Sequence, residues 1–164
     1  MSLFSSLWRI WKIRRSEEGL FNTKKYRKRD AVYFDELKTV FQWGNRYRPR
    51  SEKFEYAALV YSVSVYGDQV FYLGKTFRGM AGHGLISPNV VIPFIYLFTV
   101  EALKERLKYQ AKVAAFVHTH PKPPPGFTTR FHSRADRWLL RLPTLRAVYV
   151  IPYENDEINR EPHV

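Results

Sequence analysis

The sequence contains no cysteine, and this absence narrows the kinds of site that the protein can build. Without thiols there is no disulfide bond, no thiolate-bound zinc and no cysteine nucleophile. Any metal ion must therefore be held by histidine, aspartate or glutamate side chains.

Long apolar runs are also missing. No segment reaches the roughly 18 to 20 apolar residues that a membrane-spanning helix needs. Residues 1–8 lack the positive n-region of a signal peptide and run directly into the basic positions Arg9 and Lys12. We therefore expect the protein to act in the cytoplasm.

Acidic residues are few relative to basic ones. The chain has 27 Lys and Arg against 15 Asp and Glu, a net charge of +12. The first 50 residues hold 13 of these cations and 5 of the acids, a net of +8, so the excess lies mostly near the N-terminus. A basic surface of this kind favours anionic partners such as nucleic acid, acidic lipid headgroups or an acidic protein.

The length of 164 residues, 45% of them hydrophobic, is sufficient for one domain with a sizeable core. We expect a basic, partly helical N-terminal extension over residues 1–50, followed by the domain over 51–164. Residues 3–13 predict a short helix, which either docks on the domain or a partner, the favoured interpretation, or lies on a membrane surface. Residues 35–43 predict a second short helix.

The domain begins with the signature of a β-hairpin. Residues 56–66 are rich in β-branched and aromatic side chains, Gly67 and Asp68 are turn residues, and residues 69–73 resume the strand pattern. The pattern then predicts a glycine-rich loop at residues 74–89, a helix at 93–109 and a buried strand at 112–117. A proline-rich loop at 121–126, a helix at 133–142 and a strand at 145–151 follow. This mixture predicts an α/β or α+β fold, a mixed central sheet flanked by helices.

Two histidines, His118 and His120, stand at the end of the apolar run 113–117. Side chains at i and i+2 of a strand leave the same face, so both imidazoles can point at one place. A carboxylate from the next element would complete three ligands. A fourth position would stay open for water, as catalytic zinc requires.

The carboxylate is expected from the Ser-x-x-Asp sequence of Ser133 and Asp136. This pattern is nearly a capping box, which stabilises a helix start without any metal. An aspartate in a first helical turn also lies beside the preceding loop, so the same arrangement can start the helix and aim Asp136 at the histidines. His132 is an alternative third ligand.

These elements together resemble the JAB/MPN (JAMM) metallopeptidase family. Its signature is an early glutamate, then His-x-His-Pro at a strand end, then Ser-x-x-Asp at a helix start. The matching residues here are Glu55, His118, His120, Pro121, Ser133 and Asp136. The resemblance covers residues 55–152, is strongest to the JAB-like domains of bacterial polymorphic-toxin proteins, and implies a cytidine-deaminase-like fold.

The resemblance also implies a role for each residue. His118, His120 and Asp136 would bind zinc, Glu55 would be the general base, and Ser133 would donate to the oxyanion. The implied reaction is hydrolysis of a peptide or isopeptide bond in a protein or peptide substrate, with ubiquitin-like conjugates among the compatible ones. A toxin or effector module of this kind would meet an acidic inhibitor or immunity protein.

The sequence departs from the family pattern at three points. The 15 residues between His120 and Asp136 exceed the usual spacing, so this loop either shapes a substrate groove or displaces Asp136. Glu52 competes with Glu55 for the role of base, and His83 either is an exposed loop residue or lines the mouth of the site. The polar residues 153–164 predict that the family's terminal strand is missing or very short.

Two functions of other classes stay open. One is a catalytically inactive JAB-fold protein that binds nucleic acid or an acidic protein through its basic surface. The other is a membrane-associated module that uses residues 1–15 for contact.

Overall fold

The computed structural model describes residues 14–15, 35–65, 67–79, 91–128, 134–141, 145–154 and 157–162. The expected helix over 3–13 lies outside the described residues, as do Ser133, His132 and His83. Among the residues described, no helix has the length and apolar character needed to cross a membrane.

The centre of the domain is one mixed sheet of seven strands. Its strands are β1 Arg14–Arg15, β2 Tyr56–Val65, β3 Asp68–Leu73, β4 Phe77–Arg78, β5 Lys112–Thr119, β6 Ala147–Ile151 and β7 Asn159–Pro162. The order is β1-β4-β2-β5-β6-β7, and β3 pairs with β2 on the same edge as β4. Among the described strands only β5 and β6 run parallel, and the other pairs are antiparallel.

The expected hairpin is confirmed. Strands β2 and β3 pair in register from Val60 opposite Leu73 to Val65 opposite Asp68. Between them Gly67 has a φ of 88°, a left-handed conformation that glycine adopts without strain. The turn residues of the sequence therefore mark the actual reversal of the chain.

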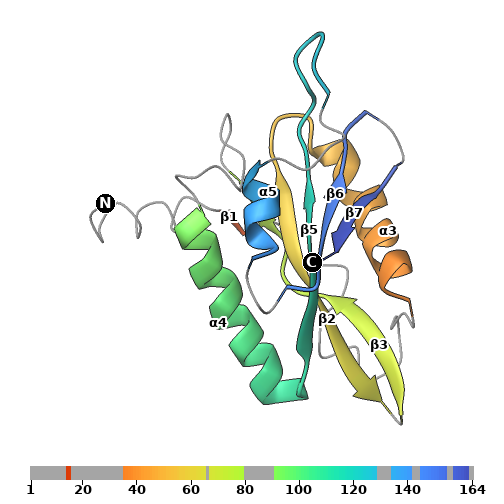
Figure 1. Ribbon diagram of the computed structural model, residues 1–164, viewed down its shortest axis with the longest axis vertical. Helices are drawn as coiled ribbons and strands as arrows, with labels where there is room; N and C mark the ends of the chain where they lie inside the picture. The colour runs from red at the N-terminus through yellow and green to blue at the C-terminus, as the bar shows by residue number, and fades with distance from the viewer. Residues whose placement is uncertain are drawn as a thin grey trace.

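Helices cover both faces of the sheet (Figure 1). On one face lies α3, Glu36–Tyr47; on the other lie α4, Val91–Tyr109, and α5, Arg134–Leu139. Side chains alternate along β5, so Val117 faces α3 while Phe116 meets Phe98 of α4 edge-on, with 5.5 Å between ring centroids. The expected mixed sheet flanked by helices is confirmed, as an α+β arrangement.

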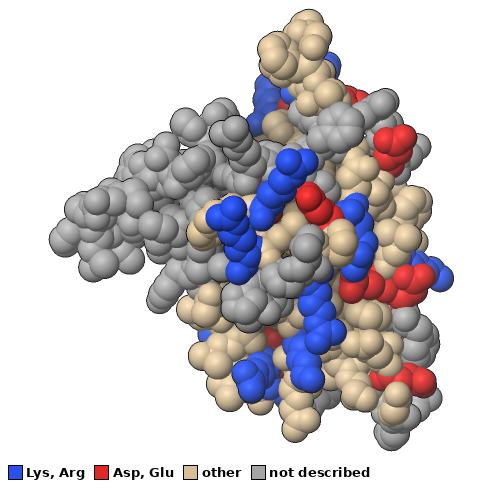
Figure 2. Space-filling view, viewed as in Figure 1, with Lys and Arg blue, Asp and Glu red and all other residues tan. Residues whose placement is uncertain are grey.

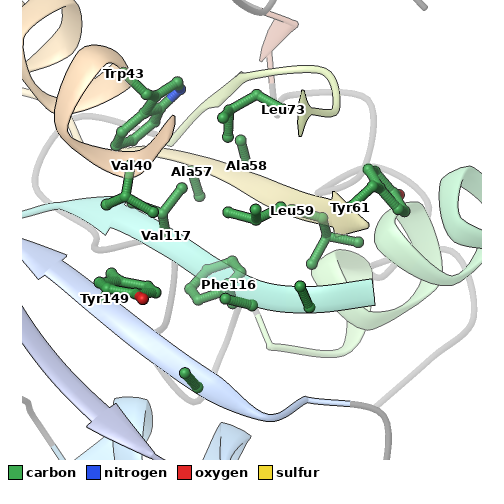
Figure 3. Close-up of a cluster of buried hydrophobic side chains, with 14 of the residues drawn as sticks. Val40, Trp43, Ala57, Ala58, Leu59, Tyr61, Leu73, Phe116, Val117 and Tyr149 are labelled. Carbon is green, nitrogen blue, oxygen red and sulfur yellow. The ribbon is translucent and has the colours of Figure 1, made fainter. Parts of the chain in front are cut away.

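Helix α3 provides much of the core on its face, although it falls in the segment expected to be an extension. Its residues Val40, Trp43 and Tyr47 are completely buried. The Trp43 indole Nε1 donates a hydrogen bond of 3.0 Å to Thr76 Oγ1. Figure 3 shows Val40 and Trp43 beside Val117 of the sheet. The helix is longer than expected, and a 3-10 turn, η1 Arg48–Arg50, follows it.

Two further boundaries differ from the expectation. The glycine-rich loop predicted over 74–89 contains β4, a two-residue strand too short to show any periodicity. The helix predicted over 133–142 ends at Leu139, and a turn follows in which the Arg141 N–H donates to the Trp138 carbonyl at 3.1 Å. The terminal strand β7 is very short, four residues long, and pairs with β6.

Candidate metal centre

The two histidines and Asp136 come together at the edge of the sheet where β5 ends. His118 lies in β5, His120 directly after it, and Asp136 is the third residue of α5. Strands β5 and β6 are parallel, with His118 opposite Val150. Because the carboxyl ends of parallel strands meet at one edge, segments that follow them gather there, and this edge is where α/β sheets bind ligands.

The three side chains converge on one point. The Nε2 atoms of His118 and His120 are 3.1 Å apart. Asp136 Oδ1 lies 3.0 Å from His118 Nε2, and Asp136 Oδ2 lies 3.6 Å from His120 Nε2. His118 is 0% exposed, His120 is 8% exposed and Asp136 is 1% exposed. Water therefore has little access to these atoms except beside His120.

Hydrogen bonds alone do not account for all the close contacts among these three side chains. A neutral imidazole has one N–H, and a proton on His118 Nε2 can point at Asp136 or at His120 but not at both. A cation between the three atoms would instead accept a lone pair from each of them. Two imidazole nitrogens and one carboxylate oxygen form a donor set that suits divalent metal ions. This buried group could hold a metal ion.

The electrostatics of Asp136 agree with a ligand role. Burial by itself raises the pKa of the Asp136 carboxyl, but the attraction and hydrogen bonds of His118 and His120 outweigh it. The pKa therefore lies well below its usual range. Asp136 is a carboxylate at neutral pH, which is the form that binds a metal.

The sheet holds both histidines in place. The His118 ring stacks on Phe116, with centroids 5.3 Å apart and planes inclined by 29°. The His120 backbone N–H donates to the carbonyl of Ile151 at 3.0 Å. Between the histidines, Thr119 Oγ1 accepts a hydrogen bond of 2.9 Å from the backbone N–H of Tyr56. The stacking orients the His118 ring, and the two hydrogen bonds fix the backbone that carries both histidines.

His118 Nδ1 is buried and has no hydrogen-bond partner among the described residues. An orphaned buried polar atom costs about 1–3 kcal/mol, so it is more typical of functional sites than of positions that serve stability alone. The His118 position is therefore hard to explain as ordinary core.

Glu55 stands directly before β2, the strand that pairs with the histidine-bearing β5. Ala57 pairs with His118 across β2 and β5, and the same register continued by two residues would bring position 55 opposite position 120. Residues directly opposite in antiparallel strands share a face. Glu52, the competing carboxylate, is 55% exposed and lies 4.0 Å from the Lys122 ammonium. Glu52 is thus paired with Lys122 at the surface, whereas Glu55 directly precedes the strand beside His118.

The long loop after His120 does not displace Asp136, since the carboxylate reaches both histidines. The loop projects beyond the sheet from the end of β5 (Figure 1). Its tip is a turn in which the Phe127 N–H donates to the Pro124 carbonyl at 3.1 Å, and the Phe127 side chain is 74% exposed.

Sequence reasoning missed Phe116, which stacks on the His118 ring, and Thr119, whose hydroxyl joins the end of β5 to β2. The position of Phe116 could have been predicted from the sequence, because Phe116 stands two residues before His118 and must share its face in a strand. No sequence pattern predicts the hydrogen bond from Tyr56 to Thr119, since the two residues are 63 positions apart and lie in different strands.

No protein-family model, curated protein or solved structure matches this chain. Its class is therefore defined by geometry: an α+β domain with a buried two-histidine, one-aspartate group at the end of a central strand.

Proposed function

We propose that this protein is a zinc-dependent metallopeptidase or isopeptidase of the JAB/MPN (JAMM) type. The observation that carries the proposal is the convergence of His118, His120 and Asp136 on one buried point. Supporting it, the hairpin, the histidine pair at a strand end and the aspartate of the next short helix occur in the order of the JAMM motif. The cytidine-deaminase-like version of this fold, and a toxin or effector role, are part of the proposal.

Each residue has a distinct task in this mechanism. His118, His120 and Asp136 would hold the ion, and bound zinc lowers the pKa of a coordinated water to about 7. Glu55 takes a proton from the attacking water and gives it to the departing amine, so a C–O bond replaces the C–N bond. Ser133, carried over from the resemblance alone, donates its hydroxyl to the oxyanion.

The experiment separates metal binding from catalysis. We expect wild-type protein to carry about one zinc ion per chain and to cleave members of a mixed peptide and isopeptide pool. His118→Ala should lose both properties. Glu55→Gln should keep the metal and lose roughly 10²- to 10⁴-fold in rate. Metal analysis by mass spectrometry and product detection in the pool provide the readouts.

Glu52→Gln is the matched control, because it removes the same charge three residues away and should keep both metal and activity. Wild-type protein that takes up no zinc, or Glu55→Gln protein as active as wild type, would contradict the proposal. Uptake of iron alone would do so as well, because two histidines and one carboxylate also form the facial triad of non-haem iron sites.

A second candidate is a catalytically inactive protein that binds an anionic partner through its basic surface. It is supported by the Lys and Arg side chains that gather on the face drawn in Figure 2. Binding to nucleic acid that weakens steeply with salt and survives His118→Ala would favour this candidate.

A further inference from the structure

A groove of about 840 Å³ lies between α4 and the starts of β5 and β6. Its helix side runs from Thr99 to Gln110, and its strand side includes Lys112, Val113 and Arg146. It lies at the opposite end of β5 from His118. About five strand residues separate Val113 from His118, or roughly 17 Å, so an occupant of the groove would leave the metal centre open.

One wall of the groove is an exposed apolar ridge. Leu103 is 56% exposed and Leu107 is 76% exposed. Residues four positions apart in a helix lie on the same face, so the two side chains are neighbours. Ala111 and Val113 continue the apolar lining on the strand side. Adjoining exposed apolar side chains of this kind mark binding surfaces.

The groove is bordered by three cations, Arg106, Lys112 and Arg146. All three side chains are exposed, and none forms an ion pair with a described residue. By contrast, Arg137 and Arg160 pair with glutamates at 3.6 and 3.9 Å. In Figure 2 Lys and Arg side chains are visible where the C-terminal end of α4 lies in Figure 1. Like charges around an apolar groove attract an anionic partner.

We propose that this groove binds an acidic amphipathic helix of a partner protein. The stretch from Thr99 to Gln110 spans roughly 16 Å at 1.5 Å per residue, which matches about three turns of a helix. A helix laid in the groove would place apolar residues at i, i+3, i+4 and i+7 against Leu103 and Leu107. Its acidic residues would meet the three cations.

Other occupants fit less well. A nucleic acid would bury Leu103 and Leu107 against a polar backbone, and the described residues that line the groove include no aromatic side chain to stack on a base. The chain's own first 15 residues carry Arg9, Lys12 and further cations, so the bordering charges would repel them. A second copy packed symmetrically on the groove would bring the same three cations together. The proposal stands independently of any activity at His118.

The test selects helical peptides of about 14 residues from a displayed library on wild-type protein, with counter-selection on Leu103→Asp/Leu107→Asp protein. We expect the recovered sequences to have net negative charge and apolar residues at helical spacing. A labelled copy of the leading peptide should lose at least about tenfold in affinity for Arg106→Glu/Lys112→Glu/Arg146→Glu protein, measured by fluorescence anisotropy.

The matched control is Lys104→Glu/Lys108→Glu, which reverses exposed charges of the same helix outside the groove and should change the affinity by less than about twofold. Circular dichroism checks that each variant is folded, and Leu107→Ala provides a milder second variant. Recovery of no leucine-dependent peptide, of neutral or basic peptides, or of peptides indifferent to the triple reversal would overturn the proposal. Tighter, groove-dependent binding of a single-stranded oligonucleotide would also overturn it.

Discussion

Phe116 links the candidate metal centre to the interior of the protein. Its ring meets Phe98 of α4 edge-on and stacks on His118, which places the three rings in one continuous row. Aromatic pairs of this kind add about 0.5–1.5 kcal/mol beyond the area that they bury. The orientation of His118 thus depends on core packing as well as on the strand.

Glu105 lies in α4, the helix that also carries Phe98, and burial changes the pKa of its carboxyl. Burial raises the pKa of the Glu105 carboxyl, although the hydrogen bond from the Tyr72 hydroxyl, 2.8 Å long, and the charge of Lys108 lower it in part. A raised pKa means that ionising Glu105 is harder in the folded state than in the unfolded state. The stability that protonated Glu105 contributes is present below the unfolded pKa of about 4.3 and is lost as the pH rises through the folded pKa.

Glu105→Gln should remove this pH dependence. Glutamine does not titrate, and its side-chain oxygen can still accept the hydrogen bond from Tyr72. We therefore expect the stability of the variant relative to wild type to increase as the pH rises from about 4 to about 7. Urea unfolding across this range measures the difference. A difference that stays constant with pH would contradict the prediction.

At the scale of the elements, α3 depends on its N-cap. Asp35 has extended backbone geometry, and its side chain accepts hydrogen bonds from the N–H groups of Leu37 at 2.8 Å and Lys38 at 3.4 Å. These bonds satisfy donors that a helix start otherwise leaves unpaired. Because Val40, Trp43 and Tyr47 follow in the same helix, the cap also supports the core.

Asp35→Ala should lower the free energy of unfolding by about 1 kcal/mol, within the 0.5–2 kcal/mol range of lost caps. Asp35→Asn is the control, because asparagine caps helices nearly as well. Denaturant unfolding of both variants provides the comparison. Equal stability of Asp35→Ala and wild-type protein would show that the cap contributes nothing measurable.

The short strands show where sequence patterns lose information. Strand β7 pairs with β6 mainly through its backbone, and its side chains alternate between half-buried and exposed. Such an edge strand needs no apolar residue, so its polar composition resembles that of a loop. Strand β4 is limited in the same way, because two residues cannot display a period of two.

On the scale of the whole molecule, the fold places two candidate functions at opposite ends of β5. The metal centre lies where β5 ends, and the groove lies where it begins. The strand between them is buried and has neighbours on both sides. A partner bound in the groove would therefore leave the candidate metal centre open.

Metal binding should stabilise the whole domain, because the three ligands join β5 to α5 and converge only in the folded state. Zinc at about 100 times its dissociation constant should add about 2.7 kcal/mol to the free energy of unfolding. The melting temperature of wild-type protein should thus rise with zinc and fall with chelator. His120→Ala should show neither change, and an equal rise in that variant would contradict binding at this centre.

The sequence by itself determined the elements whose signals are local. The hairpin, the helix ending at Tyr109 and the strand that carries the histidines follow from periodicity and turn residues within short windows. The i, i+2 spacing of His118 and His120 likewise required nothing beyond strand geometry. Absence of cysteine had already restricted any metal ligands to nitrogen and oxygen donors.

Only the tertiary structure decided what depends on distant parts of the chain meeting. Asp136 could have been displaced by the 15 residues after His120, and the parallel pairing of β5 with β6 helps return the chain to the same edge. The pairing of Ala57 with His118, which places the residue range before β2 beside the end of β5, likewise joins strands that are distant in sequence. The groove likewise exists because Arg146 lies beside α4. Such contacts depend on long-range packing, which no short window of sequence contains.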